Sequence, residues 1–224
     1  MVNKLCPLTL TLSGRGRGRP RADAQALPRE AILRQAFEAF AREGFDGLSM
    51  RQLASECGLS NSMLHHHFST KRDLWFEVAD SVFAPLFARQ MGVLDAQYVA
   101  GDAVQTLREA MRASFTLASE ATEVLGFMFR ESDGDDERGE YIRQRYMDPY
   151  MARIDALIAE GKAAGQIADL PEACLHTVVV GVMRLLLLPG KLCRDLEPHR
   201  VDAASQKAFI DALVETVVGG FIRR

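Results

Sequence analysis

The stretch "GFDGLSMRQLASECGLSNSMLHHHFSTKRDLW", residues 44–75, decides the fold. Gly44 and Gly58 divide it into short segments, because glycine favours helix ends. Ser49 and Ser60 each stand where a side-chain oxygen can cap the first turn of a following helix. Three consecutive histidines, residues 65–67, lie in the last of these segments. The pattern predicts two short helices joined by a tight Gly-Leu-Ser link.

Three adjacent imidazoles first suggest a metal site or an expression tag. Consecutive side chains on a helix diverge by about 100°, so residues 65–67 cannot share one metal ion. Helical metal ligands stand three or four residues apart. Leu64 and Phe68 keep the helical period on either side of the run, which argues against a tag. We therefore expect no metal site here.

A helical wheel of the same segment gives its histidines another use. With Leu64 and Phe68 turned toward a core, Ser62 and His66 lie on the opposite side, with Met63 beside them. The neighbouring histidines fall on the two flanks. A helix with one polar, exposed face of this kind can bind another molecule through that face.

The composition is that of an ordinary globular protein and hides a charge asymmetry. The 224 residues are 48% hydrophobic and 25% charged, which excludes a wholly disordered chain. Residues 1–72 hold 11 Lys and Arg against 6 Asp and Glu, whereas the rest hold 16 against 24. A basic first third on an acidic body indicates a polyanionic partner at one end of the molecule.

No membrane segment, metal or cofactor is expected. The longest apolar run, "TVVVGVMRLLLLPG", contains Arg184 and ends at Pro189, so it is shorter than the roughly 20 residues of a membrane span. Pro7 and a following basic block argue against a secretory signal, and a tail or a start codon assigned too far upstream fits residues 1–13 better. Four cysteines without a C-x-x-C pair fit reduced thiols in the cytoplasm.

Helical periodicity runs through the rest of the chain, and no strand alternation of useful length follows the first 26 residues. Two apolar stripes show the pattern: Val104, Leu107, Met111, Phe115 and Ala118, and then Phe209, Leu213, Val217 and Phe221. We predict an all-α protein. Residues 1–26 would be a disordered basic arm, 27–72 a small basic domain of three helices, and 73–224 a larger helical bundle.

The tight link between the second and third helices fits a helix-turn-helix, whose second member enters the major groove of DNA. From Arg29 to Trp75 the sequence resembles the N-terminal domain of the tetracycline-repressor (TetR) family of bacterial transcriptional regulators. The resemblance rests on Gly-Phe, Ser at the second-helix cap, Leu-Ala, Gly-x-Ser, Leu-aromatic-x-x-Phe, and a Lys that opens the fourth helix. It implies binding to double-stranded operator DNA.

By matched position, the resemblance implies DNA contacts from both helices of the motif. Phosphate contacts would come from Ser49 and Arg51. The side chains in the groove would be those of Asn61, Ser62, Met63 and His66, next to the capping Ser60. The DNA backbone would be contacted by His65, His67 and Lys71. Arg51 could instead be a solvated charge and Met63 a packing residue, since apolar base contacts are few. Leu48, Met63 and His65 replace the family's usual Thr, Thr and Tyr.

An arginine-rich arm precedes the motif. The sequence "RGRGRPR", residues 15–21, resembles an AT-hook core. Arg17 and Arg19 would enter a narrow minor groove, whose negative potential attracts guanidinium groups. The alternative is a solvated basic tail that adds only salt-sensitive, sequence-independent affinity.

In the resembling family, the larger domain binds a small molecule and forms a dimer. Dimerisation also follows physically, because one helix-turn-helix contacts few base pairs. The expected seam lies at about residues 173–188 and 204–222. The pocket is predicted around "FMFRES", since aromatic walls with a few polar groups suit a ligand. Its candidate residues are Phe115, Phe127, Met128, Arg130, Tyr146, Tyr150, Met183 and Arg184. Core packing explains the same aromatic stripe, and Arg184 among leucines needs an acidic partner or an anionic ligand.

The sequence thus predicts a cytoplasmic, homodimeric transcriptional repressor that a small-molecule effector releases from its operator by favouring a wider spacing of the recognition helices. No catalytic motif appears, so an enzyme is not expected. The alternative is a helical ligand-binding protein, or an enzyme, without operator binding. Because phosphate favours protonated imidazole, operator affinity should weaken from pH 6 to pH 8.

Overall fold

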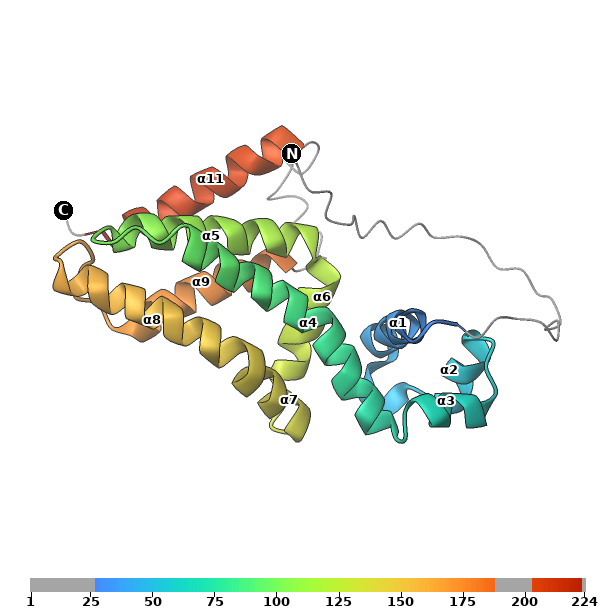
Figure 1. Cartoon of the computed structure of the whole chain (residues 1–224). Helices are drawn as coiled ribbons and strands as arrows, with labels where there is room; N and C mark the ends of the chain where they lie inside the picture. Colours follow the sequence, from blue (N-terminus) through green and yellow to red (C-terminus); the bar gives the residue numbers. More distant parts are fainter. Residues whose placement is uncertain (1–26, 188–202, 223–224) are drawn as a thin grey trace.

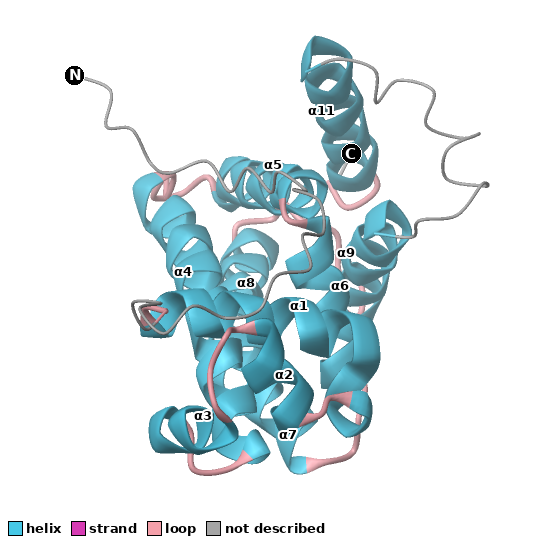
Figure 2. Ribbon diagram, turned by 90° about the vertical axis from the view of Figure 1, so that its right-hand side faces the viewer, coloured by secondary structure: helices cyan, strands magenta, loops and turns pink. Residues whose placement is uncertain are grey.

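The computed structural model describes residues 27–187 and 203–222, so the predicted arm with Arg17 and Arg19 lies outside the described part. Within these ranges the chain is helical, without a strand, as predicted, apart from an isolated bridge between Ile167 and Ile222. Figures 1 and 2 show a small group of helices at one end of a larger bundle.

The elements follow one another with short links. They are α1 (Arg29–Gly47), α2 (Met50–Glu56), α3 (Asn61–His67), α4 (Lys71–Ala96), α5 (Ala103–Glu120), α6 (Thr122–Ser132), α7 (Glu137–Ile142), a π-helical turn (Arg143–Met147), α8 (Asp148–Ala163), α9 (Glu172–Leu187) and α11 (Ala203–Gly219).

The breaks and caps of the N-terminal helices lie where the sequence places them. Gly44 interrupts α1 with a φ of 74°, and Gly58 follows α2 with a φ of 68°, a region that favours glycine. The Ser49 hydroxyl accepts a hydrogen bond from the amide of Gln52, and that of Ser60 accepts one from the amide of Met63. The two serines cap α2 and α3 as predicted.

A compact apolar core holds the first three helices against the start of α4. Leu64 and Phe68 are fully buried, which confirms the inward face of the helical wheel. Phe40 from α1, Leu53 from α2 and Trp75 from α4 fill the same core. Burial of each such side chain contributes about 1.5–3 kcal/mol, so this core fixes the orientation of α3.

Helix α5 lies at the centre of the larger bundle, with α4, α8, α9 and α11 around it (Figures 1 and 2). Its buried stripe contains Leu107, Met111, Phe115 and Ala118, as predicted. Helix α4 begins beside α3 and runs into the bundle, so a boundary near residue 72 falls within its first turn.

The apolar stripe of α11 is turned from its predicted position. Ile210 and Val214 face the core with Val217 and Phe221, whereas Phe209 and Leu213 are only half-buried. The helix is apolar over more than one face, so periodicity did not determine which face packs against α5.

Candidate nucleic-acid interface and internal cavity

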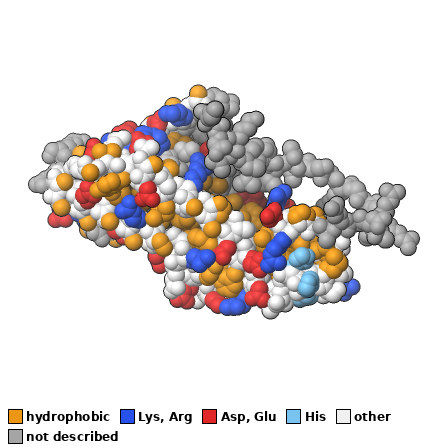
Figure 3. Space-filling model, in the orientation of Figure 1, with side chains coloured by type: hydrophobic (Ala, Val, Ile, Leu, Met, Phe, Trp, Pro, Cys, Tyr) orange, Lys and Arg blue, Asp and Glu red, His pale blue; other side chains and the backbone are white. Residues whose placement is uncertain are grey.

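Helix α3 presents one polar, solvent-facing side. Leu64 and Phe68 anchor its inner side, and the side chains of Asn61, Ser62, Met63, His65 and His66 are exposed. Met63 is unusual among them because 43% of this apolar side chain is accessible. Figure 3 shows the pale-blue histidines on the surface at this end of the molecule. An exposed helix face of this width can enter a major groove.

The three imidazoles point in different directions, as their helical spacing requires. The rings of His66 and His67 have centroids 6.2 Å apart with a 55° tilt, and His67 packs beside Phe68 at 6.1 Å. Nδ1 of His65 lies 3.2 Å from the carbonyl oxygen of Ser69. No group of His, Cys, Asp or Glu suited to a metal ion occurs among the described residues.

The serines predicted at the DNA interface also shape the helix starts. The hydroxyl oxygens of Ser60 and Ser62 are 3.0 Å apart, so the cap of α3 also orients the Ser62 hydroxyl. The hydroxyl oxygen of Ser49 lies 3.4 Å from the Gln52 amide that it caps. Each cap satisfies one of the backbone N–H groups that a helix start leaves without an intrahelical partner.

Two predicted backbone contacts, Arg51 and Lys71, have different surroundings. Arg51 is exposed and has no acidic partner among the residues described. Lys71 instead turns inward, since its ammonium donates to the carbonyl oxygens of Leu48 at 2.9 Å and Asp46 at 3.2 Å. Its third N–H is left for a phosphate. Lys71 therefore holds the end of α1 in addition to any role at DNA.

Helix α1 packs directly on the bundle. The rings of Phe37 in α1 and Phe127 in α6 meet edge to face, with centroids 5.5 Å apart. The guanidinium of Arg138 in α7 lies over the Phe45 ring at 4.0 Å, and Arg130 donates to the carbonyl oxygen of Ala41 at 3.1 Å. A change in α6 or α7 would therefore reach α1 directly.

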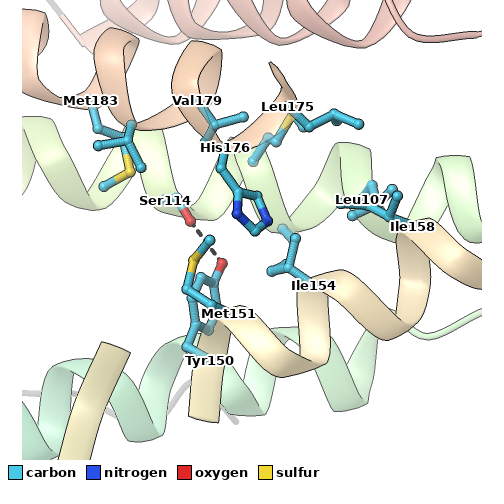
Figure 4. Close-up of a pocket in the computed structure, with 13 residues that line it drawn as sticks. Leu107, Ser114, Tyr150, Met151, Ile154, Ile158, Leu175, His176, Val179 and Met183 are labelled. Atoms are coloured by element: carbon cyan, nitrogen blue, oxygen red, sulfur yellow. Dashed lines mark hydrogen bonds between the residues drawn. The ribbon is translucent and has the colours of Figure 1, made fainter. Parts of the chain in front are cut away.

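An internal cavity lies between α5, α8 and α9 (Figure 4). Its volume is about 70 Å³. The lining is aliphatic apart from three methionines and a few polar groups; it comprises Leu107, Ala110, Met111, Ser114, Tyr150, Met151, Ile154, Ile158, Leu175, His176, Val179, Val180 and Met183. This volume is small beside the roughly 300–1,000 Å³ of typical ligand sites, so an occupant must be small or must displace side chains.

Polar groups of the lining gather at one part of the cavity, as Figure 4 shows. The hydroxyls of Ser114 and Tyr150 are hydrogen-bonded at 3.0 Å, and burial raises the pKa of Tyr150. Nε2 of His176 lies 2.8 Å from Oδ1 of Asp155 without the alignment of a hydrogen bond, and both atoms are shielded from solvent. The cavity is therefore largely apolar with one polar patch.

Comparison with known proteins identifies the helix-turn-helix. Residues 32–78 match the sequence profile of "Bacterial regulatory proteins, tetR family". The matched residues are those that build α1, α2, α3 and the start of α4. Residues 32–78 therefore form a DNA-binding domain of the TetR family, which is a family of transcriptional regulators and not of enzymes.

Similar proteins match this chain over most of its length. It is 21% identical over 199 residues to the uncharacterized HTH-type transcriptional regulator YerO of Bacillus subtilis, with 87% of this chain and 66% of YerO covered. The ketosteroid transcriptional regulator KstR2 of Mycobacterium tuberculosis has the same fold, with a TM-score of 0.68, 19% identity, and coverage of 91% of this chain and 100% of its own. AibR, solved with isovaleryl coenzyme A and operator DNA, gives a TM-score of 0.66, 19% identity, and coverage of 84% and 96%.

The structure places the residues of the predicted ligand pocket in different surroundings. Of the proposed residues, only Tyr150 and Met183 line the cavity. Four other predicted residues are buried in the core: Phe115, Phe127, Met128 and Tyr146. Phe127 packs between Phe37 and Phe83, because α6 turns its aromatic face toward α1 and α4. The Tyr146 hydroxyl donates to Asp80 in α4, and burial raises its pKa.

The predicted arginines of the pocket lie in an open groove on another side. Arg130 and Arg184 line it together with Phe127, Phe129 and Asp133, and its volume is about 790 Å³. Arg184 is exposed and pairs with Asp133 at 2.8 Å, and this hydrogen bond lowers the pKa of the Asp133 carboxyl. The expected buried cation is thus a surface ion pair, whose stabilising effect is small.

Sequence reasoning missed two polar residues of the cavity, Ser114 and His176. Each had a signal in the sequence. Ser114 interrupts the buried stripe of α5 three residues after Met111, and His176 stands within the apolar run of α9. A polar side chain on a buried helix face usually needs a partner, which is a reason to search for one. As to membranes, none of the helices in 27–187 and 203–222 is long and apolar enough to cross one.

Proposed function

We propose that this TetR-family regulator is a homodimeric repressor that binds operator DNA in the cytoplasm through α3 and leaves it when a small molecule fills the cavity. The observation that carries the proposal is the fully exposed outer face of α3 opposite the buried Leu64 and Phe68. Such a face has no packing partner in the described chain and matches a major groove in width.

The individual DNA roles follow from the geometry. Ser62, Met63 and His66 would read base edges, with Asn61 at the mouth of the groove. His65, His67 and Arg51 would hold phosphates from the flanks, and the capped starts of α2 and α3 would add backbone N–H donors at Ser49 and Ser60. Lys71 would contribute its remaining N–H. Arg17 and Arg19, outside the described residues, would enter the adjacent minor groove.

The dimer would form through α9 and α11. Val178 and Leu185 on α9 are 41% and 44% exposed, and Phe209 and Leu213 on α11 are half-buried. Exposed apolar side chains on two helices of one chain form a self-complementary face when a two-fold axis pairs them. Pairing would fix the distance between the two copies of α3, which operator half-sites require.

Release would work through the elements that join the cavity to α3. A molecule between α5, α8 and α9 would displace helices that pack around α4, whose first residues lie beside α3. It would thereby favour a spacing that does not fit the operator, and a shift of population follows from this differential affinity. AibR, a structural neighbour of this chain, was solved with both a small molecule and operator DNA.

A binding titration against the DNA upstream of the chain's own gene tests the proposal. We expect tight binding at low salt and a steep loss of affinity as salt rises, because phosphate contacts release counterions. Arg51→Ala should weaken binding to all sequences and reduce the salt slope by about one for each subunit, or about two for the dimer. Met63→Ala should relax the preference at one base pair of each half-site. Arg89→Ala is the matched control, since this exposed arginine lies on α4 in the bundle.

Failure to bind that DNA at low salt would contradict the proposal and favour a helical ligand-binding protein without an operator. If the Met63→Ala protein kept the wild-type preference at every base pair, Met63 would have no reading role.

A further inference from the structure

The cavity between α5, α8 and α9 has an apolar, adaptable wall. Met111, Met151 and Met183 stand in its lining among aliphatic side chains, each from a different helix. Methionine is unbranched and polarizable, so it can yield to ligands of somewhat different shape. The cavity volume of about 70 Å³ can therefore grow by side-chain movement, but it stays suited to a small apolar body.

The hydroxyls of Ser114 and Tyr150 in this wall share one hydrogen bond and leave one hydrogen available for a ligand. Ser114 Oγ and Tyr150 OH are 3.0 Å apart, and either can be the donor. Two hydroxyls carry two hydrogens, and their mutual bond uses one of them. Neither oxygen has a second hydrogen-bond partner among the residues that the structure describes. The pair can therefore donate one hydrogen bond to an acceptor in the cavity.

The charges around the cavity disfavour an anion. Its lining contains no Lys or Arg. His176 is the basic group at its edge, and its Nε2 already lies 2.8 Å from the Asp155 carboxylate. A carboxylate placed inside would lose its hydration without gaining a free cation, and a buried unpaired charge is costly.

We propose that the cavity binds a small, uncharged, largely apolar molecule with one hydrogen-bond acceptor, such as a ketone, and excludes the corresponding carboxylate. This inference rests on the proposed function in treating the cavity as the effector site. The acceptor would bond to the free hydrogen of the Ser114 and Tyr150 pair, and the apolar part would pack against the methionines.

Calorimetric titration of the full chain without DNA tests the ligand class with three probes of similar size. Acetophenone offers a carbonyl acceptor, ethylbenzene offers none, and benzoate carries a charge. We expect acetophenone to bind roughly tenfold more tightly than ethylbenzene, which corresponds to one buried hydrogen bond, and benzoate to bind most weakly. The inference is overturned if ethylbenzene binds as well as acetophenone, if benzoate binds best, or if acetophenone does not bind up to its solubility limit.

Paired hydroxyl variants add a readout that a change in cavity size would not produce. Ser114→Ala and Tyr150→Phe each keep one hydroxyl hydrogen, so each single variant should keep the preference for acetophenone. The double variant should lose it and bind ethylbenzene at least as well. Ser119→Ala with Tyr98→Phe is the matched control, because these hydroxyls lie outside the lining. A preference for acetophenone that persists in the double variant overturns the inference. If the double variant does not fold, the titrations of the wild-type protein test the inference alone.

The operator titration separates this inference from the proposed function. Operator binding together with a failed probe series overturns the ligand class alone. A successful probe series with a protein that does not bind operator DNA contradicts the proposed function and supports the ligand class.

Discussion

At the scale of single residues, His65 differs from its two neighbours. Its Nδ1 lies 3.2 Å from the Ser69 carbonyl oxygen, which can only accept, so Nδ1 carries the hydrogen. This contact fixes the orientation of the His65 ring beside the end of α3.

We therefore expect His65 to contribute to operator binding through a ring that is held in place. His65→Ala should weaken operator binding by up to about tenfold, because it removes a flank contact to phosphate. His176→Ala is the control in the bundle and should leave operator affinity unchanged. Fluorescence anisotropy at fixed pH and ionic strength measures both affinities, and equal affinities of the wild-type and His65→Ala proteins would contradict the assignment.

At the scale of elements, the packing of α7 against the turn that follows α6 depends on a glycine. A Cβ on Gly139 would lie 2.2 Å from the carbonyl oxygen of Gly134 and 3.0 Å from that of Glu131. Both neighbours are backbone atoms, so neither can move away cheaply. The first turn of α7 also contains Glu137, which accepts from Arg72 at 2.8 Å, and Arg138, which lies over Phe45. The position of α7 therefore affects α1 and the start of α4.

Gly139→Ala should lower the free energy of unfolding by about 1–3 kcal/mol, the usual cost of overpacking. Gly126→Ala is the control, since a Cβ there meets nothing within 4 Å in the interior of α6. It should be neutral or stabilise the helix by up to about 1 kcal/mol. Urea unfolding of both variants gives the comparison, and equal midpoints would show that the turn tolerates a side chain.

The sequence determined some elements better than others for physical reasons. Glycine breaks, serine caps and the buried pair Leu64 and Phe68 were predictable, because local rules fix them. The cavity was not, because it depends on how three helices pack. The aromatic run around Phe127 indicated a pocket, yet the relative rotation of α6 turns it into the core between α1 and α4. Helical periodicity predicts which face of a helix is apolar, but not which other helix packs against that face.

At the scale of the whole molecule, the apolar faces of α9 and α11 are the clearest sign of assembly. Val178→Glu should place a charge at the centre of the proposed seam and convert the dimer to a monomer, because an unpaired charge in an apolar interface is costly. Val99→Glu is a matched control, since Val99 is 46% exposed, against 41% for Val178, and lies in the link between α4 and α5. Light scattering after size-exclusion chromatography measures the mass, and a dimeric Val178→Glu protein would place the seam elsewhere.

The packing of Phe37 on Phe127 and of Arg138 on Phe45 limits how the molecule can be recombined. A chimera that joined these first helices to the bundle of another regulator would leave the Phe37 ring without its partner and the Phe45 ring without its guanidinium. Engineers who wish to transplant the operator preference should therefore exchange only the outward side chains of α3 and leave its supporting core intact.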